Sequence, residues 1–167
     1  MIERDAKTSV CFSGHRRVAF DMDAPHFQRI LTEAVEDAIN MGYENFYTGM
    51  AQGFDIVAAE AVLRARYNHA NAIKLHCIIP YRGQENRWSE KWLKCHDNVL
   101  KAADSIVCLN PVYTTGCYHE RNRYLVEHAS LLICLYSGKA GGTRHTFGYA
   151  EQKGLEIVNL WDRLGDY

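Results

Sequence analysis

Short apolar runs alternate with longer amphipathic segments along the chain, and this alternation limits the folds that the chain can adopt. The apolar runs, which have the length of buried β-strands, are Ser9 to Phe12, Asn45 to Thr48, Lys74 to Ile79, Ser105 to Leu109, Leu131 to Tyr136 and Glu156 to Leu160. The segments predicted as helices are Pro25 to Met41, Phe54 to Tyr67, Gln84 to Ala102, Arg121 to His128 and Arg144 to Lys153. Strict alternation of strand and helix predicts parallel strands joined by right-handed crossovers.

The predicted fold class is α/β, with a mostly parallel sheet of about six strands between two layers of helices. A chain of 167 residues has room for one such domain, so we expect a single domain over residues 1–167. In open sheets of this kind, ligands bind beyond the carboxyl ends of the strands, where the strand order reverses. The candidate functional residues are therefore expected in the turns that follow the strands.

Glycine-bearing turns follow three of the predicted strands. They are Ser13 to Arg17, Gly49 to Asp55, and Gly141-Gly142-Thr143. The third turn opens a predicted helix, so its backbone amides and the helix dipole suit a phosphate. Because all three turns follow parallel strands, we expect them at one edge of the sheet. The chain has neither a G-x-G-x-x-G fingerprint nor a Walker A loop, which disfavours ordinary NAD dehydrogenases and P-loop NTPases.

Polar groups in the first two turns are candidate ligand contacts. Ser13, Gly14, His15 and Arg16 offer a hydroxyl, a flexible backbone, an imidazole and a guanidinium to a phosphate or to the edge of a base. The alternative is a solvated turn with surface arginines. Gly49 and Gly53 permit close approach of the backbone, and Asp55 either accepts hydrogen bonds from ligand hydroxyls or only complements the helix dipole.

Further candidates come from the helices and from two other loops. Arg121 and Asn122 stand in a segment rich in tyrosine and arginine, which can stack on a base and bind a phosphate. Glu60 either reaches the pocket or pairs with an arginine. Arg82 and Gln84 follow the third strand and are expected near the same edge.

The composition excludes some classes of partner. Hydrophobic residues make up 47 % of the chain and the formal net charge is −1, so the chain as a whole does not attract a polyanion and we do not expect it to bind nucleic acid. Met1 to Asp5 lack an apolar signal region, and no apolar run is long enough to span a bilayer. We therefore expect a cytoplasmic protein with no membrane partner.

The cysteines and histidines do not form a metal-binding pattern. No two of the six cysteines have C-x-x-C spacing, and His15, His119 and His145 stand in separate loops. We predict no metal site and no required cofactor. The cysteines are predicted to be small core residues in a reducing compartment.

The motifs named above resemble those of a known family, in the same order along nearly the whole chain. They are Cys11 to Arg16, Gly49, Gly53 to Asp55, Ala59-Glu60, Ile79-Pro80, Gln84, Trp88, Arg121 to Tyr124, Gly141 to Thr143 and Tyr149-Ala150. Together they resemble the YpsA-like family of the SLOG superfamily, which includes DprA (Smf) and the LOG cytokinin-activating enzymes. The resemblance implies a Rossmann-like domain of a bacterial or phage protein that binds a nucleotide-type ligand, such as ADP-ribose, AMP or NAD, at the strand ends.

The resemblance leaves the activity open. LOG members hydrolyse the N-glycosidic bond of a nucleoside monophosphate with an arginine similar to Arg121 and a glutamate shortly after their glycine-rich turn. Thr146 to Gly148 occupy the place of that glutamate here, so Asp55, Glu60 or Glu120 would have to supply the acid or base.

Three functions are therefore open. The first is a sensor or carrier module that binds a small nucleotide ligand and acts through a separate effector protein. The second is a LOG-like hydrolase of a nucleotide, acting on its N-glycosidic or phosphate linkage, with Arg121, Asp55 and Glu60 as catalytic residues. The third is binding of single-stranded DNA, as in DprA. A homodimer is a further expectation, since members of the superfamily commonly pair.

Overall fold

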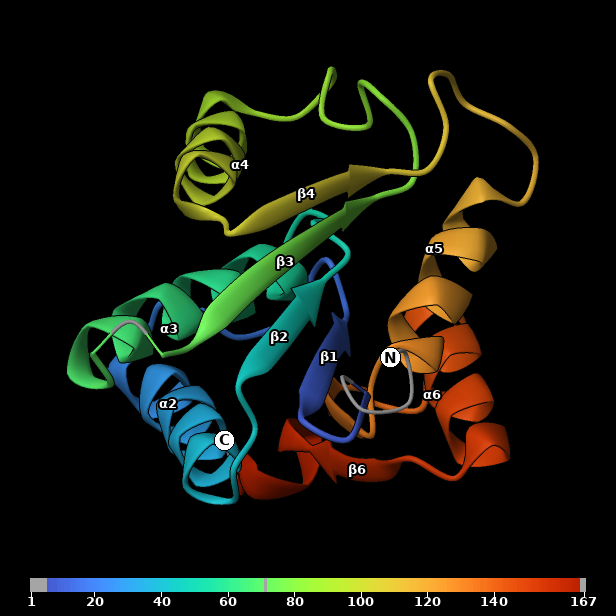
Figure 1. Cartoon of the computed structure of the whole chain (residues 1–167). Helices are drawn as coiled ribbons and strands as arrows, with labels where there is room; N and C mark the ends of the chain where they lie inside the picture. The colour runs from blue at the N-terminus through green and yellow to red at the C-terminus, as the bar shows by residue number, and fades with distance from the viewer. Residues whose placement is uncertain (1–5, 71, 166–167) are drawn as a thin grey trace.

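A six-stranded sheet runs through the described part of the chain, residues 6–70 and 72–165 of this computed structural model (Figure 1). Its strands are β1 (Ser9–Gly14), β2 (Asn45–Thr48), β3 (Lys74–Ile79), β4 (Ser105–Cys108), β5 (Leu131–Leu135) and β6 (Glu156–Asn159). They lie in the order β4-β3-β2-β1-β5-β6, and each neighbouring pair is parallel. The predicted α/β architecture, with helices on both faces of the sheet, is confirmed.

The strand order reverses between β1 and β5. From β1 the chain adds β2, β3 and β4 outward on one side, and it then returns to add β5 and β6 on the other side. Hydrogen bonding is continuous across this point, because Cys11 of β1 pairs with Tyr47 of β2 and with Leu132 of β5. The carboxyl ends of β1 and β5 therefore border the crevice where sheets of this kind bind ligands.

The helices divide between the two faces of the sheet at the same point. One face carries α2 (Pro25–Asn40), α3 (Phe54–Asn68), α4 (Glu90–Ala102) and the short helix η1 (Leu160–Arg163), and the other carries α5 (Cys117–Glu127) and α6 (Gly142–Lys153). A right-handed crossover places its helix on opposite faces for opposite directions of travel across the sheet, which explains the division. None of the helices within residues 6–70 and 72–165 combines the length and apolar character that crossing a membrane requires.

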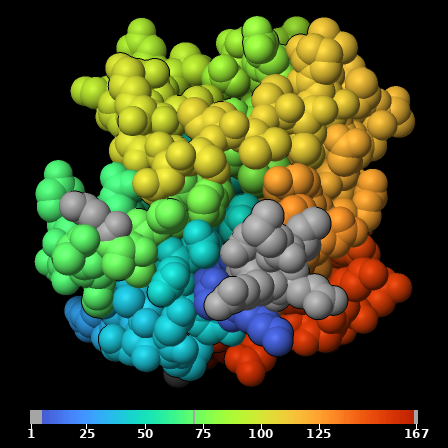
Figure 2. All heavy atoms as spheres, in the orientation of Figure 1, coloured from blue at the N-terminus to red at the C-terminus, as the bar shows by residue number. Residues whose placement is uncertain are grey.

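The two hydrophobic cores follow from the alternation of side chains along the strands. Val10 and Phe12 of β1 point into the core under α2 and α3, whereas Cys11 between them points into the core under α5 and α6. Phe12 stacks on Phe46 with the ring centroids 6.0 Å apart. The core under α5 and α6 is the smaller of the two. On that face of the sheet, atoms of β3 and β4 reach the surface (Figure 2).

The predicted starts of two helices are wrong. The third predicted helix begins at Glu90 instead of Gln84, because residues 80–88 form turns in which Gly83 has a φ of +96°. The fourth begins at Cys117, four residues before its predicted start, directly after Gly116 with a φ of +81°. The earlier start of α5 places Tyr118 and His119 on a helix that borders the crevice.

The cysteines fit the prediction of core residues only in part. All six are free thiols, and Cys11, Cys77, Cys117 and Cys134 are buried. Cys95 is half-buried and Cys108 is exposed, so the prediction of a core position is wrong for Cys108. The reason is its place on β4, which lies at the edge of the sheet.

Gly14 and Gly148 provide a paired test of the packing beside the crevice. A Cβ at Gly14 would overlap the ring of Phe54, whereas a Cβ at Gly148 in α6 would meet no atom within 4 Å. We expect Gly14→Ala to lower the free energy of unfolding by about 1–3 kcal/mol. Gly148→Ala should leave it unchanged or raise it by up to about 1 kcal/mol, because alanine favours the helix. Urea denaturation measures both, and equal effects of the two variants would contradict this account.

Candidate functional site

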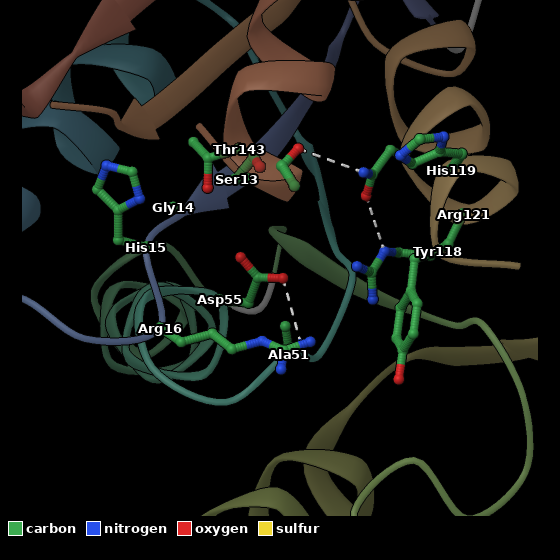
Figure 3. A pocket seen from close by; sticks show the side chains of 13 residues that line it. Ser13, Gly14, His15, Arg16, Ala51, Asp55, Tyr118, His119, Arg121 and Thr143 are labelled. Atoms are coloured by element: carbon green, nitrogen blue, oxygen red, sulfur yellow. Dashed lines mark hydrogen bonds between the residues drawn. The ribbon is translucent and has the colours of Figure 1, made fainter. Parts of the chain in front are cut away.

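A cavity of about 410 Å³ lies at the carboxyl ends of β1 and β5, in the crevice where the strand order reverses (Figure 3). It is lined by Ser13, Gly14, His15, Arg16, Ala51, Asp55, Tyr118, His119, Arg121, Asn122, Gly141, Gly142 and Thr143. These residues come from the three predicted glycine turns and from the first turns of α5. The cavity is therefore built from four separate segments of the chain.

One wall of the cavity is the N-terminus of α6. Gly141 is the residue before the first turn, and its φ of +144° is one that a side chain would strain. Since glycine has no capping side chain, the first amides of α6 are open to the cavity. Thr143 and Ser13 add hydroxyl groups here and are 6 % and 8 % exposed. This wall combines open amides, hydroxyls and the positive end of a helix dipole, which together suit an anion.

The turn after β2 holds the carboxylate of Asp55 in the floor of the cavity. Thr48 Oγ1 accepts a hydrogen bond from the amide of Met50 at 3.2 Å and donates to the carbonyl of Asp55 at 3.1 Å. Met50 has a φ of +57°, an uncommon conformation for a residue with a side chain. The amide of Ala51 then donates to Asp55 Oδ2 at 3.2 Å. The strained turn thus fixes the position of one acidic group.

Burial dominates the electrostatics of Asp55. Only 5 % of the residue is exposed, and desolvation raises the pKa of its carboxyl from 3.8 to about 6. Arg121, the amide of Ala51, Arg16 and the amide of Gly14 each lower the pKa but do not offset the burial. Asp55 therefore changes charge close to neutral pH.

Hydrogen bonds of Arg121 and Asn122 in α5 connect separate segments of the cavity wall. Arg121 Nη1 donates to the carbonyl of Gly49 at 2.9 Å, and Arg121 Nε donates to Asn122 Oδ1 at 3.0 Å. Asn122 Nδ2 in turn donates to the carbonyl of Gly142 at 3.4 Å (Figure 3). Burial lowers the pKa of Arg121, and the nearby Asp55 opposes that shift. The chain of bonds connects the turn after β2 to the start of α6.

His15 is held in a neutral form. Its Nε2 accepts a hydrogen bond from the amide of Ser137 at 2.9 Å, which leaves Nδ1 to carry the proton of the neutral ring. Burial and the charge of Lys139 lower its pKa. On the opposite side of the cavity, His119 stacks on His145 with ring centroids 3.8 Å apart, and burial and the neighbouring His119 lower the pKa of His145. The surroundings of His15 and of His145 therefore favour neutral imidazoles at neutral pH.

Most of the predicted site residues lie together. The structure brings to the cavity Ser13, Gly14, His15, Arg16, Asp55, Arg121, Asn122, Gly141, Gly142 and Thr143. Gly49 and Gly53 lie directly behind this lining. A Cβ at Gly49 would come within 2.6 Å of the Arg121 side chain, and a Cβ at Gly53 would overlap the backbone of Arg16. These two glycines are needed for close packing behind the cavity wall.

Besides Gly49 and Gly53, three further predicted site residues and one alternative lie outside the lining. Gln84 Nε2 donates to the carbonyl of Met50 at 3.1 Å and so supports the strained turn from behind. The backbone of Arg82 donates to the carbonyl of Asn110, and Glu120 accepts from the side chain of Asn110. Glu60 is half-buried beside the charges of Arg64, Asp23 and Lys91, and its burial raises its pKa. Glu60 therefore has no place in the proposed site.

The cavity also contains residues that sequence reasoning missed: Ala51, Tyr118 and His119. Tyr118 stands three residues before Arg121 and His119 three before Asn122, which is the spacing of neighbours on one side of a helix. A sequence prediction that began this helix at Cys117 would have identified both Tyr118 and His119 as neighbours of the site. Ala51 offers its backbone and carries no chemical signal in the sequence. Among the described residues, no group of three or more His, Cys, Asp and Glu side chains lies close enough to hold a metal ion.

A comparison with known protein families identifies the family of this chain. The family model YpsA, described as the YspA SLOG family, matches residues 10–157. The chain belongs to the YpsA family. The YpsA-family match covers the whole sheet except Ser9 of β1 and the last two residues of β6, and it includes every residue that lines the cavity.

Curated relatives and solved structures agree with membership of the YpsA family. The chain is 25 % identical over 134 residues to the SPbeta prophage-derived protein YoqJ of Bacillus subtilis, covering 73 % of this chain and 77 % of YoqJ. It is 29 % identical over 133 residues to a UPF0398 protein of Bacillus pumilus, covering 74 % of this chain and 69 % of that protein. These relatives are named without a stated activity.

Two solved structures of DNA processing protein A share the fold. The protein from Streptococcus pneumoniae superposes with a TM-score of 0.62 at 17 % identity, over 96 % of this chain and 54 % of its own. The protein from Helicobacter pylori, solved for its single-stranded DNA binding mode, gives a TM-score of 0.61 at 16 % identity, over 98 % of this chain and 73 % of its own. At these identities the likeness establishes a common fold. The chain spans about half the length of the pneumococcal protein.

Replacing Asp55 by asparagine is expected to stabilise the protein at neutral pH. The folded state favours the protonated carboxyl, because the pKa is about 6 in place of 3.8. The wild type should therefore lose stability relative to Asp55→Asn as the pH rises from about 4 to about 6, by up to about 3 kcal/mol at 1.36 kcal/mol per pKa unit. Urea denaturation between pH 4 and pH 8 measures this difference.

The exposed Asp97→Asn on α4 is the matched control for this series. Its stability should run parallel to that of the wild type over the same pH range. A difference between wild type and Asp55→Asn that does not change with pH would contradict the assignment of a raised pKa to Asp55.

Proposed function

We propose that this protein binds a nucleotide or a nucleotide-derived small molecule, such as ADP-ribose, AMP or NAD, in the cavity at the ends of β1 and β5. One observation carries the proposal: an open helix N-terminus and the buried side chains of Asp55 and Arg121 line one cavity at the point where the strand order reverses. Membership of the SLOG group supports a role related to nucleotides. Binding would make the protein a sensor or carrier module.

The phosphate would lie on the turn Gly141-Gly142-Thr143. The first amides of α6 and the hydroxyls of Thr143 and Ser13 would supply donors to a phosphate there. Arg121 and Asn122 would hold a second anionic group beside this turn. An anion here would also provide the counter-charge that the buried Arg121 lacks when Asp55 is protonated.

The sugar of the ligand would contact Asp55. A carboxylate held at the floor of the cavity can accept hydrogen bonds from two neighbouring hydroxyl groups, which is the role of acidic residues at the ribose in nucleotide-binding α/β folds. Its burial makes this carboxylate costly in the empty protein, and hydroxyl donors from a ligand would reduce that cost. Ligand binding should therefore lower the pKa of Asp55.

Binding is tested first by analysing what purifies with the protein. We expect mass spectrometry of the denatured wild type to detect a nucleotide, and we expect ADP-ribose, AMP or NAD at millimolar concentration to raise the melting temperature. A ligand at 100 times its Kd adds about 2.7 kcal/mol to the free energy of unfolding. Asp55→Asn and Arg121→Gln should abolish both signals, because each removes a buried group at the centre of the cavity.

Two variants control for general effects of these substitutions. Glu60→Gln changes an acidic residue of the same helix as Asp55, outside the cavity, and Arg123→Gln changes an exposed arginine two positions from Arg121. Both should bind as the wild type does. The proposal fails if no nucleotide co-purifies and none of the three compounds shifts the melting temperature.

Hydrolysis of the nucleotide is the second candidate function, and the raised pKa of Asp55 favours it. Cleavage of an N-glycosidic bond needs a group that stabilises positive charge at the sugar or moves a proton near it. Asp55 lies opposite Arg121, the residue similar to the catalytic arginine of LOG enzymes. In this reaction Asp55 would act as a carboxylate.

If the protein is a hydrolase of this kind, incubation with AMP or ADP-ribose releases a free base or ribose 5-phosphate. The rate should rise as the pH passes through about 6 and then level off, because the active carboxylate of Asp55 forms over that range. Measuring kcat/KM against pH for wild type and Glu60→Gln tests this, and Asp55→Asn should be inactive. A rate that is equal in wild type and Asp55→Asn would reject the role of Asp55.

Binding of single-stranded DNA is supported only by the common fold with DNA processing protein A. The net charge of −1 argues against it, because affinity for polynucleotides depends on neutralising many phosphates. A gel shift with single-stranded DNA that weakens as salt is added would favour this function over the small ligand.

A further inference from the structure

Three tyrosines gather beside the cavity, two on the loops that follow β3 and β4 and one in the first turn of α5. We call Tyr81, Tyr113 and Tyr118 the tyrosine cluster. The rings of Tyr81 and Tyr113 meet edge to face with centroids 5.4 Å apart, and those of Tyr81 and Tyr118 do so at 6.0 Å. The hydroxyls of Tyr81 and Tyr118 lie 3.3 Å apart. The three side chains therefore hold one another in place.

The tyrosine cluster is continuous with the cavity but extends outside it. Tyr118 lines the cavity, and the guanidinium carbons of Arg16 and Arg121 lie 5.9 Å and 5.7 Å from the centre of its ring. Tyr113, at the other end, is 59 % exposed and follows Val112, which is 63 % exposed. A rigid aromatic surface thus leads from the charged groups of the cavity to solvent.

Packing among the three rings does not explain why the tyrosine cluster lies beside the cavity or why Tyr113 is exposed to solvent. Large apolar side chains that gather on a surface usually mark a binding site. Tyrosine and arginine together form surfaces on which nucleobases stack, because the ring and the guanidinium are both flat. The cluster stands next to Arg16, whose guanidinium is exposed at the mouth of the cavity.

We propose that the tyrosine cluster is a base-stacking subsite, which binds the nucleobase of the ligand whose phosphate lies on the turn Gly141-Gly142-Thr143. This inference rests on the proposed function and narrows its ligand class: the cavity selects compounds with an aromatic base over sugar phosphates without one. Tyr113 provides the exposed face for the base, and Tyr118 with Arg16 connects that face to the cavity.

The order of groups around the cavity matches the order of groups in a nucleotide. In Figure 3, Ser13 and Thr143 lie at one end, Tyr118 lies at the other, and Asp55 is drawn between them. A nucleotide with its phosphate at the first end would present its ribose to Asp55 and its base to the tyrosine cluster. A tyrosine hydroxyl is neutral at neutral pH, and the hydrogen bond with Tyr118 raises the pKa of Tyr81 further, so the tyrosine cluster places no negative charge beside the base.

Calorimetry with matched ligands tests the subsite on the full chain. The probes are AMP, CMP and ribose 5-phosphate, which share the sugar and phosphate and differ in the base. We expect AMP and CMP to bind about 5- to 150-fold more tightly than ribose 5-phosphate, the range that stacking of one base provides. Tyr113→Ala, outside the cavity lining, should remove most of this difference and leave the affinity for ribose 5-phosphate unchanged. Tyr118→Leu should also reduce the difference between AMP and ribose 5-phosphate.

Tyr67→Ala is the matched control, because Tyr67 is 88 % exposed at the end of α3 and lies outside the cavity. It should leave the affinities for all three probes as in the wild type. Equal affinities of the wild type for AMP, CMP and ribose 5-phosphate would overturn the subsite and leave the proposed function intact. An equal loss for all three probes in Tyr113→Ala would also overturn it. Failure of every probe to bind would overturn the subsite. The proposed function would fall with it only if, in addition, no nucleotide co-purifies and neither ADP-ribose nor NAD shifts the melting temperature.

Discussion

The bond from Arg121 to the carbonyl of Gly49 holds together the parts of the cavity that different segments supply. It ties α5, on one face of the sheet, to the turn after β2, which leads into α3 on the other face. Through Asn122 the same group reaches the start of α6. A buried guanidinium is costly unless its donors are satisfied, so each of these partners stabilises Arg121 and is positioned by it. The turn after β2, the first turns of α5 and the start of α6 are therefore held together by one set of hydrogen bonds.

The strands and the edge of the site could be predicted because both follow from local rules. A short apolar run has few alternatives to a buried strand, and all turns after parallel strands lie at one edge. The start of α4 could not be predicted in this way. The segment after Pro80 has apolar residues at helical spacing, but its conformation depends on Gly83 and on the bond from Arg82 to Asn110, which is distant in the sequence.

The assignment of Glu60 illustrates how the sequence limits a site prediction. Asp55 and Glu60 are five residues apart in α3, and at 100° per residue their side chains leave the helix in directions about 140° apart. Asp55 faces the cavity, so Glu60 faces the packing between α3 and its neighbours, where the charges of Arg64, Asp23 and Lys91 surround it. Without knowing which side of α3 meets the cavity, the two carboxylates were equally suitable. Only the tertiary packing decides between them.

Several residues of the cavity are held in energetically unfavourable states, and contacts with a ligand would offset part of this cost. Burial disfavours both the charge of Asp55 and that of Arg121, and Met50 holds a strained backbone in the turn between them. Proteins tolerate such costs mainly at functional sites. A long polyanion would place its charges along a surface, where exposed lysines and arginines neutralise them at little cost. Here the charged groups are few and converge from three segments on a space of about 410 Å³. This arrangement fits the compact ligand proposed above, with few charges and several hydroxyl groups, for which the buried Asp55 and Arg121 would provide selectivity in return for the stability that they cost.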